Sequence, residues 1–210
     1  MSTDPHQGAA PRIIAIAGGS GSGKSYLARQ LHQALAPRAT ILTLDHFYLD
    51  LSHLPHHQRE RVNFDDPAAI DWKSVESALL DLISGKQALI PDYDFTTHTR
   101  AANFQTLAPA PFILLEGLWT LSRAAIREIC HLTIFVDCPD ETRFARRLAR
   151  DTTERGRSSE SVHRQYTEQV RPMHDLHVQP QILHADLTLA SPFGDHEIAA
   201  ILARLGAPTK

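Results

Sequence analysis

The octapeptide at residues 18–25, GGSGSGKS, constrains the fold of this chain more than any other segment. It satisfies the pattern GxxxxGK[ST], follows the apolar run IIAIA and precedes a helical pattern that begins at Lys24. A glycine-rich turn between a strand and a helix is typical of a phosphate-binding loop. The backbone N–H groups and the helix N-terminus surround a polyphosphate, Lys24 reaches the outer phosphates, and Ser25 can bind Mg²⁺. A flexible Gly/Ser turn would not explain the flanking elements.

The sequence does not fit a guanine-nucleotide switch, which would normally carry an NKxD motif. The only asparagines are Asn63 and Asn103, and neither precedes a lysine. We therefore expect a nucleoside triphosphate to be bound for phosphate transfer. The expected contacts are the residues of the loop and the one that follows it: Gly18, Gly19, Ser20, Gly21, Ser22, Gly23, Lys24, Ser25 and Tyr26.

Short apolar runs alternate with helical patterns along the chain, which predicts a parallel sheet covered by helices on both faces. The expected strands are 13–17, 40–44, 112–115, 132–136 and 186–189. The expected helices are 24–35, 72–84, 122–130, 141–150, 159–173 and 195–205. The fold class is therefore α/β, a P-loop NTPase core with a five-stranded parallel sheet. Two segments fit neither pattern, 46–66 and 92–110, and we expect functional loops there.

Composition favours a globular protein with a small ligand. We expect one domain over residues 12–210, with a flexible tail at 1–11. The formal net charge of -3 provides no overall basic surface for nucleic acid. The first residues lack a basic segment followed by an apolar one, and no apolar run approaches the ~20 residues that cross a bilayer. We therefore expect a cytoplasmic protein, in which Cys130 and Cys138 are thiols outside any disulfide or zinc site.

Two acidic residues follow expected strands. Asp45 comes after ATILTL, and Glu116 ends FILLE. Ligands of open α/β sheets bind beyond the carboxyl ends of the strands, so both carboxylates should meet the phosphate-binding loop. Asp45 could accept the proton of an attacking hydroxyl, and Glu116 could hold Mg²⁺ directly or through water. Either residue, taken alone, could instead be a turn or capping residue.

Positive charge is concentrated in one stretch, because six arginines lie between residues 143 and 157 while the whole chain has four lysines. Arg147, Arg150, Arg155 and Arg157 are expected to form a lid that closes over bound phosphates. An amphipathic helix with a solvated polar face is the alternative, and it accounts for Arg143 and Arg146. The lid would extend over about residues 147–160.

The segment PDYDFTTHTR at 91–100 combines aromatic rings, an imidazole and a guanidinium. Tyr93, Phe95 and His98 could enclose a heterocyclic ring. Alternatively, the two aromatic side chains pack in the protein and the histidine lies in an exposed loop.

In order, these motifs resemble those of the uridine kinase (uridine–cytidine kinase) family over residues 13 to about 192. The match rests on GGSGSGKS, LTLDHFYLDLSHLP, NFDDP, PDYDFTTHTR, LLEG, FVDCPDETRFARRLARDTTERGR and QYTEQVRPMH. The resemblance implies a Mg²⁺-dependent kinase that transfers phosphate from ATP, or from GTP, to the 5′-hydroxyl of uridine or cytidine in pyrimidine salvage. It also implies homotetramers and feedback by pyrimidine triphosphates.

The resemblance further implies roles for individual residues. Asp45 would be the catalytic carboxylate, Lys24, Arg150 and Arg155 would act on the phosphates, and Glu116 would belong to the Mg²⁺ environment. The acceptor-side segments would cover about 45–66 and 91–110. The implied nucleoside contacts are Tyr48 beside the catalytic carboxylate, Asp65 at the ribose hydroxyls, Tyr93 and His98 around the pyrimidine, and Arg147, Arg157 and Gln165.

Three positions depart from the family pattern. Ile182 and Leu183 stand where the family usually has basic residues, which predicts an altered donor affinity. Asp66 stands where the family commonly has histidine, which predicts a shifted acceptor preference. Two other functions stay open: a sibling kinase for ribulose 5-phosphate, pantothenate or nicotinamide riboside, and a nucleotide-binding regulator without turnover.

Overall fold

The structure, a computed structural model, describes residues 10–59 and 61–206. Most of the expected tail, residues 1–9, lies outside the described residues. The main sheet has five parallel strands in the order β2-β5-β1-β6-β7. This confirms the predicted five-stranded parallel sheet. The strands are β1 (Arg12–Gly18), β2 (Ala39–Thr43), β5 (Phe112–Gly117), β6 (Leu132–Asp137) and β7 (Leu187–Ala190).

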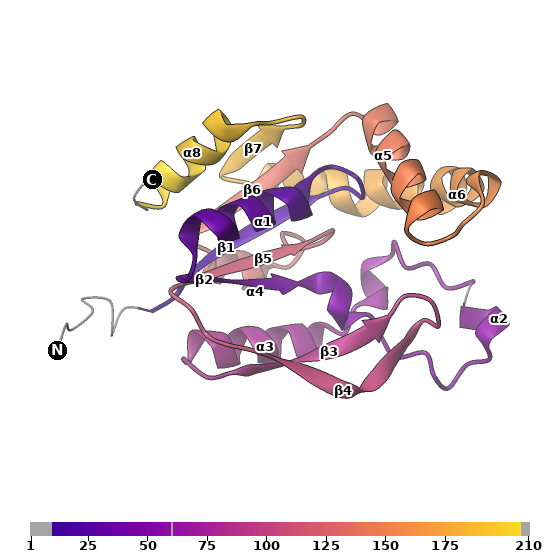
Figure 1. Cartoon of the computed structure of the whole chain (residues 1–210), viewed down its shortest axis with the longest axis horizontal. Coiled ribbons are helices and arrows are strands. Elements are labelled where there is room, and N and C mark those ends of the chain that lie inside the picture. Colours follow the sequence, from indigo (N-terminus) through magenta and orange to yellow (C-terminus); the bar gives the residue numbers. More distant parts are fainter. Residues whose placement is uncertain (1–9, 60, 207–210) are drawn as a thin grey trace.

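Helices cover both faces of this sheet. Successive side chains of β1 point to opposite faces, so its apolar residues contact the helices on both sides. Ile14 and Ile16 pack with α1 (Lys24–Leu35) and α8 (Asp195–Arg204). Residues Ile13 and Ala15 pack on the other face, in the core cluster that includes α3 (Trp72–Ile83) and α4 (Ala124–Ile129). Figure 1 shows α8 and α3 on opposite sides of the sheet. The main sheet is therefore buried on both faces.

The segment expected to be irregular at 92–110 is largely a β-hairpin, so that prediction is wrong. The strands β3 (Ala88–Asp94) and β4 (Thr99–Leu107) pair antiparallel and form a second sheet. The pairing shifts between Pro91 and Tyr93, and most of β4 is exposed. A proline, a register shift and an exposed strand together obscure the period-two pattern from which a strand is read.

The other irregular segment contains short helical turns, η1 (Leu44–Phe47) and α2 (His56–Arg59), and η2 (Pro67–Ala69) follows it. In Figure 1, α2 and the tip of the β3–β4 hairpin lie at the same end of the molecule.

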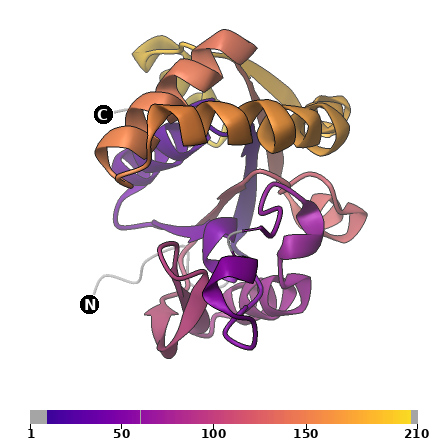
Figure 2. The same cartoon turned by 90° about the vertical axis from the view of Figure 1, so that its right-hand side faces the viewer.

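A helical region follows β6 and runs across the upper half of the view in Figure 2. It starts with α5 (Asp140–Thr153) and α6 (Ser159–Gln165). The expected helix at 159–173 continues to His184, because wider π-helical turns and a 3-10 turn accommodate Pro172 and Pro180, which lack the backbone N–H. Within the described residues, we find no helix that combines the length and apolarity needed to span a membrane. Beyond α6, the helical region up to His184 comprises η3 (Tyr166–Val170), α7 (Arg171–Met173), η4 (His174–Val178) and η5 (Gln179–His184).

Candidate active site

A cleft of about 1090 Å³ lies at the carboxyl ends of the central strands. Its walls come from the phosphate-binding loop, the turn after β2, the β3–β4 hairpin and the α5–α6 region. Figure 2 shows the helical region from α5 onward above the segment that carries α2. The lining brings together many predicted site residues: Ser20, Lys24, Asp45, Tyr48, Asp65, Tyr93, His98, Arg147, Arg150, Arg155, Arg157 and Gln165.

The other predicted residues lie outside this lining. All but one belong to the phosphate-binding loop or the first turn of α1. Tyr26 is 44% exposed, and its ring lies 5.9 Å from that of Phe193. The predicted residues outside the lining are Gly18, Gly19, Gly21, Ser22, Gly23, Ser25, Tyr26 and Glu116.

The backbone of the loop requires glycine. Gly21 has φ +79, and a Cβ atom there would lie 2.5 Å from the carbonyl oxygen of Arg143. The N–H of Ser22 donates to the carbonyl of Gly19 at 3.0 Å, which closes the turn. The Ser22 hydroxyl is buried without a hydrogen-bond partner among the described residues. A tight glycine-lined turn with an unsatisfied donor at a helix N-terminus fits a bound phosphate group.

Next to the loop lies a hydroxyl–carboxylate pair. The Ser25 hydroxyl donates to Oε2 of Glu116 at 3.0 Å. Glu116 is held at the tip of β5, where it pairs in register with Thr43 of β2 and Ile16 of β1. Burial raises the pKa of its carboxyl, and Lys24 partly opposes that shift. Oxygen ligands of this kind suit Mg²⁺, which also takes ligands from substrate phosphates.

Asp45 is in the first turn of η1, directly after β2. Because β2 and β5 are neighbours, Asp45 just after β2 and Glu116 near the end of β5 lie at the carboxyl ends of adjacent strands. Asp45 and Lys24 both influence the pKa of Glu116, and both line the cleft. The structure therefore unites the loop lysine and the two strand-tip carboxylates, as predicted.

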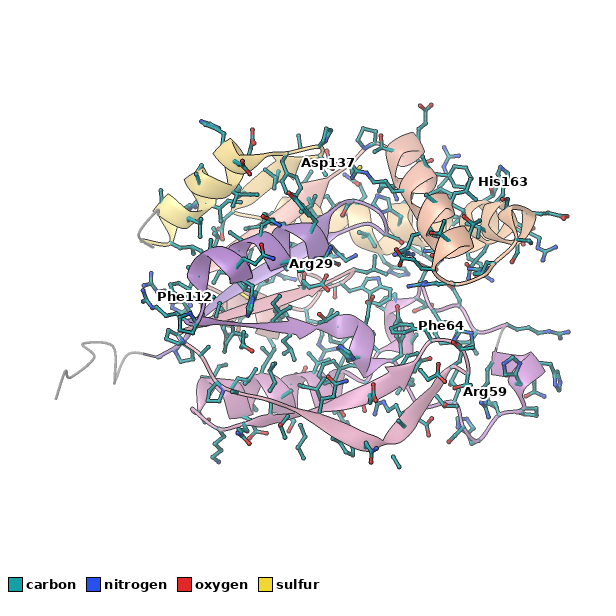
Figure 3. All side chains as sticks on the ribbon, viewed as in Figure 1. Arg29, Arg59, Phe64, Phe112, Asp137 and His163 are labelled. Carbon is teal, nitrogen blue, oxygen red and sulfur yellow. The ribbon has the colours of Figure 1, made fainter. Side chains whose placement is uncertain are left out.

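Aromatic side chains form the opposite wall. The rings of Tyr48 and Tyr93 are 5.3 Å apart, and Phe64 stacks on His98 at 4.4 Å with an interplanar angle of 17°. Phe64 lies on the same side of the molecule as the projecting α5–α6 region (Figure 3). The Tyr93 hydroxyl is buried without a hydrogen-bond partner among the described residues, and burial raises its pKa. Phe64 belongs to the NFDDP motif, but its role in this wall could not be predicted from that motif.

Arg100 anchors the hairpin instead of facing the cleft. Its guanidinium donates to the carbonyls of Tyr48 at 2.8 Å and Phe47 at 3.2 Å, and it pairs with Asp71 at 3.1 Å. These contacts fix β4 to the turn that carries Asp45. Arg100 therefore helps to hold the aromatic wall in position beside Asp45.

We expect Arg100→Met to lower the free energy of unfolding by about 1–3 kcal/mol, because two backbone carbonyls and a carboxylate lose a charged donor. Denaturant unfolding followed by circular dichroism measures this change. Arg29→Met, an exposed position on α1, is the control. A change at Arg100 no larger than the control's would contradict the anchoring role.

The arginines of α5 differ in part from the prediction. Arg143 is only 3% exposed, so its assignment to a solvated face is wrong. Its guanidinium donates to the carbonyl of Cys138 and to Asp140. Arg146 lies on the exposed side but donates to the carbonyl of Gly21 at 3.2 Å. This face of α5 packs against the phosphate-binding loop. The carbonyl of Cys138 and the Asp140 carboxylate compensate the charge of Arg143, and the carbonyl of Gly21 accepts from Arg146.

The other four arginines surround Asp151, a residue for which no role was predicted from the sequence. Its side chain is fully buried, and Arg147, Arg150, Arg155 and Arg157 all lie within 3.6 Å of its carboxylate oxygens. The spacing from Arg147 to Asp151, i to i+4 on a helix, was the available signal.

Further polar contacts connect the lid arginines to the cleft. Arg147 donates to the Ser20 hydroxyl at 3.1 Å and to Gln165 at 3.0 Å, and lies 3.7 Å from Asp65. Arg157 also donates to Gln165. Burial raises the pKa of the Asp65 carboxyl, and Arg147 lowers it in part. The lid side and the acceptor side thus meet at Arg147.

The three departures from the family pattern lie outside the cleft lining. Asp66 caps η2, where its carboxylate accepts from the N–H of Ala68 at 2.7 Å. Ile182 packs against the core, and Leu183 is 83% exposed. None of the three faces the cleft.

Comparisons with known proteins agree with this geometry. Residues 13–193 match the model of the Phosphoribulokinase / Uridine kinase family. The chain is 44% identical over 180 residues to a uridine kinase of Deinococcus deserti, covering 85% of this chain and 87% of the relative. It is 37% identical over 189 residues to a uridine kinase of Halobacterium salinarum, covering 90% of this chain and 83% of the relative. The fold is similar to that of phosphoribulokinase from Rhodobacter spheroides, with a TM-score of 0.64 and 16% identity over 86% of this chain and 70% of the other.

Proposed function

The chain belongs to the Phosphoribulokinase / Uridine kinase family, and on that premise we propose that it is a uridine kinase, which transfers the γ-phosphate of ATP to the 5′-hydroxyl of uridine or cytidine. The products are UMP or CMP, together with ADP. The observation that carries this proposal is the shared cleft, in which the loop lysine Lys24 and the carboxylate Asp45 face an aromatic wall at Tyr93 and His98.

Phosphoryl transfer asks the protein mainly to align the reactants and to stabilise charge. The 5′-oxygen bonds to the γ-phosphorus, the bond between that phosphorus and the β–γ bridging oxygen breaks, and Asp45 accepts the hydroxyl proton. Lys24, Arg150 and Arg155 stabilise the negative charge on the phosphates. Ser25 and the neighbouring Glu116 would hold Mg²⁺, which would neutralise part of the charge on the β- and γ-phosphates.

The nucleoside occupies the aromatic side of the cleft. Tyr93, His98 and the stacked Phe64 contact the pyrimidine, and Asp65 accepts hydrogen bonds from the ribose hydroxyls. Tyr48 lies beside Tyr93 and completes this wall. The substrate-side polar residues are Arg147, Arg157 and Gln165.

We also propose one kinase domain from residue 12 onward, with acceptor segments at about 45–66 and 91–110 and a lid at about 147–160. The protein is cytoplasmic and forms homo-oligomers, tetramers by the family resemblance. GTP can replace ATP as the donor, and calorimetry with each nucleotide tests this.

One assay tests the main proposal. Purified protein is incubated with Mg·ATP and, separately, uridine, cytidine, ribulose 5-phosphate, pantothenate and nicotinamide riboside. Mass spectrometry then identifies any phosphorylated product. We expect UMP or CMP. A product from another acceptor would favour a sibling kinase, and nucleotide binding without any product would favour a regulator.

We expect His98→Tyr to change the uridine-to-cytidine ratio of kcat/KM by about tenfold or more. A histidine ring nitrogen can donate or accept a hydrogen bond, so it can pair with the 4-carbonyl of uracil or the 4-amino group of cytosine. Steady-state kinetics with both nucleosides measure the ratio. His196→Tyr, on the exposed start of α8, is the matched control. An unchanged ratio would remove His98 from the specificity site.

A further inference from the structure

Asp151 provides the only carboxylate that four guanidinium groups share in the part of the chain that the structure describes. Its Oδ1 lies 2.8 Å from Arg150 and 3.5 Å from Arg155. Its Oδ2 lies 3.4 Å from Arg147 and 3.6 Å from Arg157. Since its side chain is fully buried, solvent does not screen these contacts as it would on the surface.

The backbone brings the lid to the same residue. Helix α5 ends at Thr153, and the chain reverses at Gly156, which has φ +62. The N–H of Arg157 then donates to the carbonyl of Asp151 at 3.1 Å. The loop therefore curls back onto Asp151, which holds it by its carbonyl as well as by its carboxylate.

The charges around Asp151 are only partly balanced. One carboxylate faces four guanidinium groups, and arginine stays protonated in proteins. Burial lowers the pKa of Arg155, Arg150 lowers it further, and Asp151 partly opposes these effects. Oδ2 has no hydrogen bond of good geometry to Arg147 or Arg157 among the described residues. The cluster therefore keeps excess positive charge toward the cleft.

We propose that Asp151 is a positioning residue for phosphoryl transfer. It holds Arg150 and Arg155 in the arrangement that stabilises the transferred phosphate, and it holds Arg147 and Arg157 beside the substrate. This inference rests on the proposed kinase function. The carboxylate touches no reacting atom, and it acts through Arg147, Arg150, Arg155 and Arg157. The negative charge of Asp151 also repels the phosphates of the donor. Asp151 therefore aligns the arginines but lowers the affinity of the site for the donor.

Because of these two opposing effects, we expect Asp151→Asn to lower kcat without raising the KM for Mg·ATP. The variant keeps the size of the side chain but leaves four like charges to repel one another, so the arginines move from their aligned positions. We expect kcat to fall by about 10–100-fold, since a small misplacement of aligned groups can cost ~100-fold. The KM for Mg·ATP should stay constant or fall, because a negative charge near the phosphates has been removed. Simple damage to the lid would instead raise KM as kcat falls.

The experiment measures kcat and KM for Mg·ATP at saturating uridine in the wild-type protein, Asp151→Asn and the control Glu128→Gln. Glu128 is an exposed carboxylate on α4, outside both the lid and the cleft lining. A reduced kcat without a raised KM for Asp151→Asn, with both constants unchanged in the control, supports the inference. A kcat within twofold of the wild type, or a KM that rises in step with the loss of kcat, overturns it.

Asp151→Glu serves as the second variant if Asp151→Asn does not fold, as judged by circular dichroism. It retains the charge but moves the carboxylate by one methylene, so we expect kcat to fall about tenfold with KM for Mg·ATP unchanged. A wild-type kcat in this variant would overturn the inference. Wild-type protein that phosphorylates neither uridine nor cytidine would instead refute the proposed function, so the two failures are distinguishable.

Discussion

Asp45→Asn is expected to lower kcat for uridine by about 10²–10⁴-fold, the range typical of a lost general base. Asparagine preserves the size of the side chain but cannot accept the proton of the 5′-hydroxyl as a carboxylate does. The residue lines the cleft directly after β2, beside the loop lysine. The KM for Mg·ATP should change little, because Asp45 is assigned to the acceptor.

Steady-state rates of UMP formation by the wild-type and variant proteins measure this effect. Asp195→Asn is a suitable control, because Asp195 is an exposed carboxylate at the start of α8, away from the cleft lining. Near-normal turnover in Asp45→Asn would show that another group accepts the proton.

Lys24→Ala should produce a comparable loss, about 10²–10³-fold in kcat, the cost of removing one preorganised group that stabilises developing charge. Lys24 begins α1 and is 8% exposed, so its ammonium acts in a partly desolvated site at the edge of the cleft. It also lowers the pKa of Glu116, against the larger effect of burial. The variant therefore loses positive charge both at the phosphates and beside the expected Mg²⁺ site.

The control for this change is Lys86→Ala, at an exposed lysine after α3. Both variants are compared with the wild-type protein for kcat and for thermal unfolding. A folded Lys24→Ala protein whose kcat stays within threefold of the wild type would remove the lysine from the transfer step.

Much of the core could be predicted from the sequence. Buried parallel strands are continuous apolar runs, so β1 was recognised from IIAIA, and α1 was predicted at its observed bounds from the loop to Leu35. The carboxyl ends of parallel strands converge, so Asp45 and Glu116 could be assigned to one edge without coordinates.

The lid and the hairpin were harder, since their patterns do not follow an apolar core. Arg143 is buried because it packs against the phosphate-binding loop and its guanidinium donates to the carbonyl of Cys138 and to Asp140, contacts that no helical periodicity reveals. The position of Phe64 depends on its stacking with His98, a residue 34 positions away whose φ is 55. Arg157 joins Arg147, Arg150 and Arg155 around Asp151 because the chain reverses at Gly156, and a charge pattern alone resembles a solvated helix face.

A crystal structure with uridine and a non-hydrolysable ATP analogue with Mg²⁺ is the most direct test of the account. The proposed mechanism places the analogue's phosphates in the loop at residues 18–25. It also places a carboxylate oxygen of Asp45 about 2.6–3.2 Å from the 5′-oxygen of uridine. A 5′-oxygen that points away from the γ-phosphate, or an Asp45 too distant to reach it even through one water, would contradict the account.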